Sequence, residues 1–164
     1  MNADDVAKLH DLLSNFATAM LITRNAEDLL HARPMELVKV DESGTIWFLS
    51  PDDSGKVHEI DHDTRVDLIF QKEHTLYVAV EGIASISRDR QKIAELWKEP
   101  FRVWFPGGKE DPTISLIAVE PRRAEYWDSK GWNKVSYLFK AAQAYASGKT
   151  PEIKEGEEHG VLTS

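Results

Sequence analysis

The alternation of apolar and polar residues predicts a chain built mainly from short strands with a few helices. Near the start, apolar residues recur at steps of three and four, which is typical of an amphipathic helix: Val6, Leu9, Leu13 and Phe16. The capping candidates Asn2 and Asp4 stand before this run. The clearest strand is 76–86, where alternate residues are apolar and Gly82 interrupts the run as a bend or bulge would.

The rest of the chain shows the same preference for strands. Further β-compatible runs are found at 18–24, 37–40, 45–49, 66–70 and 114–127, the last as a strand pair or one long bent strand. Ser43 and Gly44 predict the turn that joins 37–40 to 45–49 as a hairpin. Short amphipathic helices are expected at 93–97, behind Asp89, and at 135–145, and a Pro- and Gly-rich loop at 101–112.

These elements define the expected fold. The strands follow one another without long helical crossovers, so we expect antiparallel neighbours. About six strands with three to four helices predict a mainly β protein, a β-barrel with α-helices around it. The 164 residues, 41% of them hydrophobic, are enough for one domain, expected at 1–146. The following segment, 147–164, is polar and is expected to be a mobile tail.

Composition narrows the possible functions. The formal net charge of −8 disfavours binding to nucleic acid. The chain has no cysteine, which excludes disulfides, thiolate zinc sites, iron–sulfur clusters and cysteine nucleophiles, and which agrees with a cytoplasmic location. The first residues are acidic rather than basic, and no apolar run reaches the length of a membrane span. We therefore expect neither a signal peptide nor a membrane anchor.

One short motif suggests a metal site. The sequence His58-Glu59-Ile60-Asp61-His62 matches H-E-x-x-H, in which two histidines one helical turn apart bind zinc beside a glutamate base. The predicted helix is short, however, and no third ligand follows it in the pattern of a metalloprotease. We expect no metal and interpret the motif as a short surface helix with two solvated histidines. A zinc hydrolase is kept as a remote alternative.

Two segments carry groups suited to a phosphate. Arg33 precedes Pro34 and Met35 at the start of a strand, and its guanidinium offers a planar set of donors for an anion. Lys56 stands at the expected start of a helix, where free backbone N–H groups and the hydroxyls of Ser50 and Ser54 are close in sequence. On these residues alone, a surface arginine and a capped turn with a solvated lysine remain open.

Six short blocks in the same order give the chain a specific resemblance. It resembles the flavin-binding split barrels related to pyridoxamine 5′-phosphate oxidase, in particular the bacterial general stress protein branch, from the first helix to about Ala146. The blocks are HARPM at 31–35, IWFLS at 46–50, KVHEI at 56–60, YVAVEG at 77–82, WFP at 104–106 with DP at 111–112, and AEYWD at 124–128.

The resemblance implies a homodimer of six-stranded antiparallel split barrels with FMN in two clefts between the subunits. It assigns Arg33 and Lys56 to the ribityl phosphate, with help from Ser54 and Ser50. It also implies that the backbone of Pro34 and Met35 and of Phe48, Leu49 and Ser50 lines the isoalloxazine. Trp127 would reach the flavin from the partner subunit, and Tyr77 lies where the oxidase has a flavin-contacting glutamine. FAD or a deazaflavin remains an alternative to FMN.

The chain also departs from the oxidase. Gly55 stands where the oxidase has an arginine beside its lysine, and the segment after Trp127 lacks the arginine and histidine that bind pyridoxal phosphate. We therefore expect the flavin site to be retained and pyridoxamine phosphate oxidation to be lost. The leading hypothesis is a flavin-dependent oxidoreductase with a small-molecule electron donor or acceptor. The alternative is a non-catalytic flavin carrier linked to stress.

Overall fold

The computed structural model describes residues 1–73, 75–128 and 159–163. One α-helix begins the described chain, a second lies between the fourth and fifth strands, and a third lies between the sixth and seventh strands, followed by two 3-10 helices. The helices are α1 (Ala3–Leu13), α2 (Gly55–His62), α3 (Arg90–Leu96), η1 (Glu99–Val103) and η2 (Gly108–Glu110). The strands are β1 (Thr18–Arg24), β2 (Leu30–Glu36), β3 (Lys39–Val40), β4 (Ile46–Pro51), β5 (Arg65–Lys72), β6 (Leu76–Ser87), β7 (Ile114–Asp128) and β8 (His159–Thr163).

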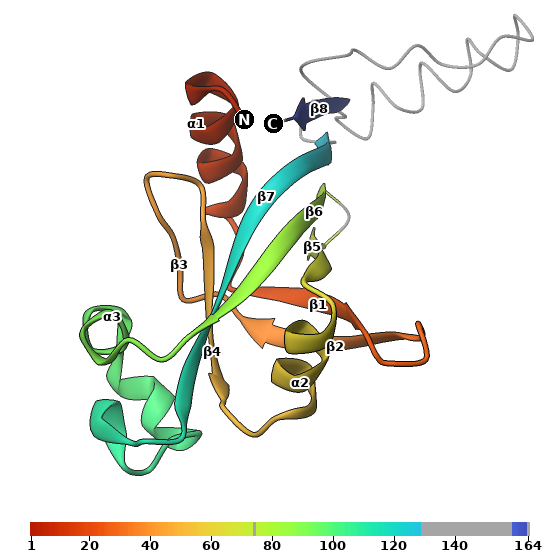
Figure 1. Ribbon diagram of the computed structural model, residues 1–164. Helices are drawn as coiled ribbons and strands as arrows, with labels where there is room; N and C mark the ends of the chain where they lie inside the picture. The colour runs from red at the N-terminus through yellow and green to blue at the C-terminus, as the bar shows by residue number, and fades with distance from the viewer. Residues whose placement is uncertain (74, 129–158, 164) are drawn as a thin grey trace, which may run out of the picture.

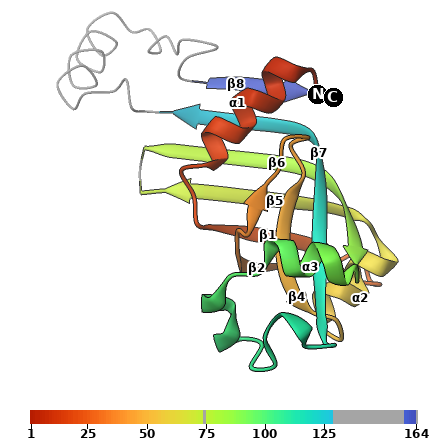
Figure 2. The ribbon, with the colours of Figure 1, turned by 90° about the vertical axis from the view of Figure 1, so that its left-hand side faces the viewer.

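The strands form one antiparallel sheet in the order β2-β1-β5-β6-β7-β4-β3, and β8 pairs with β7 (Figures 1 and 2). β2 lies at one edge and β3 at the other, yet only residues 37 and 38 separate them in the chain. Leu37 donates its backbone N–H to Ala17, beside β1, and Val38 donates to Trp47 of β4. The segment β2–β3 thus crosses from one edge of the sheet to the other and closes a barrel.

This closure explains the strand count. When β2 and β3 are counted as one bent strand, the barrel has six strands. The strand β8, which the sequence did not predict, pairs with β7 in addition to these six. The predicted mainly β class, a six-stranded antiparallel split β-barrel, is confirmed. Beyond the seam at residues 37 and 38, no ladder in the described part of the chain joins β2 to β4, so the barrel is open between these two strands.

The barrel interior is filled by alternate residues of the long strands. The inward-facing side chains of β6 include Leu76, Val78 and Val80, each at most 1% exposed. β6 runs beside β7 over its whole length, and the register shifts between Glu81 and Gly82. This shift confirms the bulge or bend predicted at Gly82. A Cβ at Gly82 would lie 2.9 Å from the backbone oxygen of Glu120, so the close approach of the two strands requires glycine.

Helix α1 covers one end of this core, as its apolar spacing predicted. Asn2 caps the helix by accepting a hydrogen bond from the backbone N–H of Asp5 at 2.9 Å. The buried face of the helix consists of Leu9, Leu12 and Leu13. Phe16 follows the helix instead of belonging to it, and its ring packs on that of Phe70 with centroids 5.4 Å apart.

The segment from α3 to η2 forms a second, smaller core at the opposite end of the barrel (Figure 1). The expected helix behind Asp89 is confirmed, and the Asp89 side chain caps it by accepting from the N–H groups of Gln91 and Lys92. The expected loop at 101–112 instead contains part of η1 and all of η2. Phe101 of η1 and Phe105, which follows η1, are buried, and the ring of Trp97 meets both in edge contacts.

Three expectations concern the C-terminal part. The predicted helix at 135–145 and most of the predicted tail lie outside the described residues. Within that expected tail, residues 159–163 form the strand β8, which pairs with β7 and buries Leu162. Among the described residues, no helix is long and apolar enough to cross a membrane.

Candidate functional site

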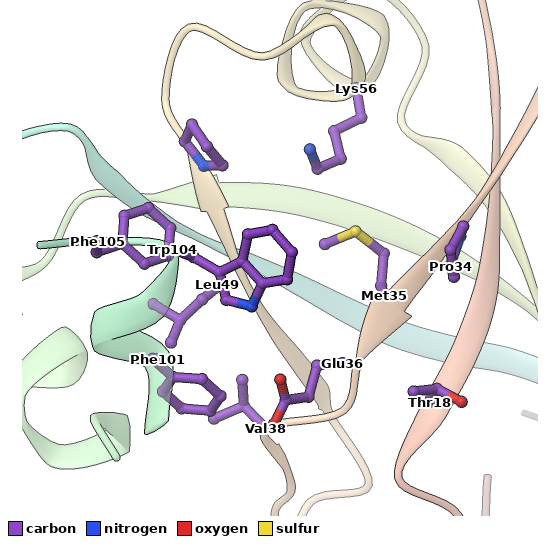
Figure 3. Close-up of a pocket in the computed structure, with 11 residues that line it drawn as sticks. Thr18, Pro34, Met35, Glu36, Val38, Leu49, Lys56, Phe101, Trp104 and Phe105 are labelled. Atoms are coloured by element: carbon purple, nitrogen blue, oxygen red, sulfur yellow. The ribbon is translucent and has the colours of Figure 1, made fainter. Parts of the chain in front are cut away.

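A cavity of about 530 Å³ lies where the barrel is open between β2 and β4 (Figure 3). Residues of β2 form one wall and residues of β4 the other, and the segment around η1 covers one end. The lining residues are Thr18, Pro34, Met35, Glu36, Val38, Leu49, Pro51, Lys56, Phe101, Trp104 and Phe105. This volume lies within the range of small-molecule sites, which are mostly apolar with a few polar groups.

The cavity brings together four of the ten predicted site residues: Pro34, Met35, Leu49 and Lys56. Phe48 and Ser50 alternate with the lining residues of β4, Leu49 and Pro51, and are fully buried on the other face of that strand. Their side chains therefore belong to the interior. Only the backbone of 48–50 is at the edge of β4 that faces β2, which is the part that the sequence prediction concerns.

Helix α2 begins at the cavity, and its first turn has unused donors. Ser54 is the N-cap residue, but its side chain makes no capping bond to the helix. Its Oγ instead lies 2.9 Å from that of the buried Ser50. Within the described residues, the backbone N–H groups of Gly55 and Lys56 have no hydrogen-bond partner. A Cβ at Gly55 would meet no atom within 4 Å, so open space adjoins these donors.

The Lys56 side chain extends from α2 into the cavity (Figure 3). Burial lowers the pKa of Lys56, the nearby charge of Arg33 lowers it further, and Glu59 opposes both effects. No hydrogen bond or ion pair to the Lys56 amine is found in the described part of the chain. A half-buried ammonium beside free N–H groups at a helix N-terminus is an arrangement that favours an anion.

Arg33 lies near Lys56 but does not line the cavity. Its Nη2 donates to Glu59 Oε2 at 2.8 Å, and its Nη1 donates to the hydroxyl of Thr23. Thr23 is fully buried and donates in turn to Glu59, whose other oxygen lies 2.5 Å from His31 Nδ1. We call these four residues, Thr23, His31, Arg33 and Glu59, the polar cluster. It connects β1 and β2 to α2.

The polar cluster also defines the state of Glu59, the acidic residue of the H-E-x-x-H motif. Burial by itself would raise the pKa of Glu59, but hydrogen bonds with Thr23, His31 and Arg33 hold it below its usual value. Both histidines of the motif, His58 and His62, are exposed. Among the described residues, no group of three or more His, Asp or Glu side chains is placed to hold a metal ion.

The remaining predicted residues, Tyr77 and Trp127, lie on the outer face of the sheet, away from the cavity lining. They are directly opposite one another on β6 and β7 and are 36% and 41% exposed. The next strand, β8, adds His159 to this pair. The His159 ring stacks on Trp127 with centroids 5.4 Å apart and an angle of 27°. The described chain therefore does not bring these two aromatic residues to its own cavity.

Sequence reasoning missed the aromatic end of the cavity, which consists of Phe101, Trp104 and Phe105. Trp104 and Phe105 belong to one of the six blocks that carry the resemblance, but neither received a role in the site. A signal was present, because three aromatic residues in five positions are unusual for a surface loop. Glu36 was also missed. It is the charged residue of the lining other than Lys56, and the two lie at opposite sides of the cavity (Figure 3).

The fold and the cavity thus define a split-barrel protein with a mostly apolar cavity beside the N-terminus of a helix. Comparison with known families identifies it further. A profile of the family described as Pyridoxamine 5′-phosphate oxidase like matches residues 4–152. The chain therefore belongs to the pyridoxamine 5′-phosphate oxidase-like family, which confirms the recognised resemblance. No curated protein sequence matches the chain.

Solved structures agree with this assignment. A candidate general stress protein 26 from Jannaschia sp. CCS1 is 23% identical and superposes with a TM-score of 0.74 over 99% of this chain and 100% of that one. The general stress protein 26 of Bacillus anthracis str. Sterne is 24% identical, with a TM-score of 0.66 over 74% and 92%. The general stress FMN/FAD binding protein of Xanthomonas citri is 27% identical, with a TM-score of 0.67 over 79% and 92%.

Proposed function

We propose that this protein binds a flavin nucleotide, FMN in the first place, in the cavity between β2 and β4. One observation carries the proposal: the half-buried amine of Lys56 stands at one side of a mostly apolar cavity. The Xanthomonas citri neighbour, named as an FMN/FAD binding protein, supports it. FAD and a deazaflavin share the phosphate and the flat ring system and remain alternatives to FMN.

The residues present fit the two halves of such a ligand. Lys56, the free N–H groups of Gly55 and Lys56 and the hydroxyl of Ser54 would hold the phosphate. The edges of β2 and β4 that face each other make no ladder bonds in the described part of the chain. Their backbone groups are therefore available to the polar edge of a ring. Arg33 would contribute chiefly through its charge, since Glu59 and Thr23 already occupy two of its donors.

The chain would then position the cofactor and exclude water from it. Pro34 fixes its own φ and supplies no N–H, so the strand beside the ring is rigid. Met35 and Leu49 provide apolar contacts on the two walls. When bound, the isoalloxazine of the flavin supplies the electron transfer. No side chain has to act as a nucleophile or general base, and none of the described residues is assigned such a role.

The proposal includes a homodimer, because the outer face of the sheet carries an exposed row of apolar residues. The registers place Pro34, Met20, Ile69 and Ala79 in one row across β2, β1, β5 and β6. Met20 and Ile69 are 39% and 38% exposed. Tyr77 and Trp127 follow in the adjacent row. Since Pro34 also lines the cavity, a partner seated on this face would border the site and offer its own Trp127 to the flavin.

We infer a flavin-dependent oxidoreductase with a small-molecule donor or acceptor, and a flavin carrier as the alternative. At the end of the cavity away from Lys56, Val38, Phe101 and Phe105 are apolar and offer no positive charge to a second phosphate, which supports the loss of pyridoxamine phosphate oxidation. The absence of cysteine agrees with a cytoplasmic protein.

Mass spectrometry of the small molecule released from native protein tests the cofactor, and quenching of FMN fluorescence measures its affinity. A colourless protein that leaves FMN fluorescence unchanged would refute the proposal. Reduction by NAD(P)H followed by reoxidation distinguishes an oxidoreductase from a carrier, which would bind FMN without turnover. Light scattering tests the dimer, and the double variant Met20→Glu with Ile69→Lys is expected to be monomeric.

A further inference from the structure

The end of the cavity opposite Lys56 has its own chemistry, which the flavin does not account for. Phe101, Trp104 and Phe105 form this end together with Val38, and Glu36 is the charged residue beside them (Figure 3). We propose that it binds a second, flat aromatic molecule that is neutral or cationic, as the co-substrate of the flavin. This inference rests on the proposed function and defines the substrate class of the same site.

The aromatic end is built before any ligand arrives. Phe101 and Phe105 are 3% and 4% exposed and are braced by Trp97, whose ring centroid lies 6.0 and 6.5 Å from theirs. Arg102 fixes the turn by pairing with Glu99 at 3.0 Å and donating to the backbone oxygen of Pro106 at 3.3 Å. The two phenylalanines therefore form a rigid apolar floor, and ligand binding does not have to order it.

Trp104 differs from its two neighbours because it is free to contact a ligand. It lines the cavity and is nevertheless 72% exposed. Its backbone is held, since its N–H donates to Phe101 at 2.9 Å. A large indole fixed at the mouth of an apolar cavity offers one face to a planar ring, and such aromatic pairs are favourable beyond the area that they bury.

The charge at this end selects among aromatic molecules. Glu36 is exposed on β2, and the other charged lining residue, Lys56, lies on the far side of the cavity (Figure 3). A phosphate or carboxylate on the second molecule would meet the Glu36 carboxylate, and among the described lining residues the positive charge is that of Lys56 on the far side. The amine of Lys98, beside Val38, already donates to the backbone oxygen of Val38 at 3.0 Å. A neutral ring or one that carries an amine would meet no such repulsion. The site therefore favours neutral and cationic aromatic compounds over anionic ones.

Three naphthalene derivatives of the same shape test this selection on FMN-saturated protein: 2-naphthylmethylamine, 2-naphthalenemethanol and 2-naphthoate. Calorimetry is expected to give the tightest binding for the amine, then the alcohol, then the carboxylate. Trp104→Ala should weaken the amine and the alcohol by about threefold to tenfold. Glu36→Gln should remove the difference between amine and carboxylate. Val103→Ala, a change at an exposed neighbour outside the lining, should alter nothing.

The outcomes separate this inference from the proposed function. If FMN binds but the carboxylate binds as tightly as the amine, or if Trp104→Ala leaves the affinities unchanged, the inference is overturned and the flavin site stands. A Trp104→Ala variant that dissociates the dimer and keeps its ligand affinity would likewise overturn it, because the indole would then be an interface residue. If FMN does not bind but the naphthalene series behaves as expected, the proposed function fails and the aromatic site stands alone.

Discussion

Arg33 and Lys56 lie near one another beside helix α2, but their charges are in opposite situations. The guanidinium of Arg33 is paired with Glu59 and Thr23 inside the polar cluster, where the Glu59 side chain is only 13% exposed. The amine of Lys56 is half-buried at the cavity, with no partner among the described residues. The comparison shows that two cations that look equivalent in the sequence differ in their partners within the protein. We therefore expect Arg33 chiefly to hold the fold together and Lys56 to be available to a ligand.

The largest expected effect is on stability, at the polar cluster. Glu59→Ala leaves the buried Thr23 hydroxyl and the Arg33 guanidinium without their acceptor, so the free energy of unfolding should fall by about 2 to 4 kcal/mol. Urea denaturation measures this loss. Asp61→Ala, at an exposed position of the same helix, is the control and should stay within about 0.5 kcal/mol of the wild type. Equal losses in both variants would show that the polar cluster does not hold α2.

The second largest expected effect is on the affinity for FMN, at Lys56. Lys56→Met should weaken FMN by about tenfold to a hundredfold and leave riboflavin, which has no phosphate, unchanged. Arg33→Met should weaken FMN less and destabilise the fold more. Fluorescence quenching with both ligands measures the two affinities, and Lys72→Met at an exposed position is the control. An Arg33 variant that loses more FMN affinity than the Lys56 variant would reverse the division of roles.

A gain is expected where open space adjoins the phosphate donors. Gly55→Arg would place a second cation beside Lys56, and its Cβ would meet no atom within 4 Å. FMN should bind about threefold to tenfold more tightly, with riboflavin unchanged. A cation at a helix N-terminus is unfavourable by a few tenths of a kcal/mol, so a slightly lower melting temperature should accompany the gain. No gain for FMN would place its phosphate elsewhere.

The smallest expected effect is the dependence of stability on pH. The pKa of Glu59 is lower in the folded protein than its ordinary value of 4.5, because its hydrogen bonds outweigh the effect of burial. The stabilisation that ionised Glu59 gives to the folded protein is therefore complete above pH 4.5, and it is lost as the pH falls through the lower pKa of the folded state. In denaturation series at several pH values, the difference between wild type and Glu59→Gln should shrink below pH 4.5. A constant difference would contradict the ionised state of Glu59.

Much of the fold could be predicted because it depends on local pattern. The apolar spacing at 6–16 located α1, the Ser43-Gly44 turn located the β3–β4 hairpin, and the run 18–24 coincides with β1. β8 was missed because its segment is short and has two adjacent apolar residues, Val161 and Leu162, instead of an alternating pattern. Its pairing with β7 is a tertiary contact. The spacing of apolar residues and the residue types of turns carry no information about such a contact.

The candidate site was harder to predict, since its decisive contacts join distant parts of the chain. Lys56 at the start of a helix was visible in the sequence. The pairing of Arg33 with Glu59 was not, because 26 residues separate them and Glu59 looked like part of a zinc motif. Trp104 was visible as an aromatic residue, but only the packing of η1 at the end of the barrel places it at the cavity.

The crossing at residues 37 and 38 has a consequence for how ligand range can change in evolution. One short stretch closes the barrel and also sets the spacing between β2 and β4. An insertion or deletion there would shift both strands at once and disturb the whole core. The segment 99–112 packs outside the barrel and meets the crossing at the buried Val38, so replacements at its exposed positions, such as Trp104, alter the mouth of the site and leave that contact in place. New specificities should therefore arise through changes in that segment, while the length of the crossing stays constant.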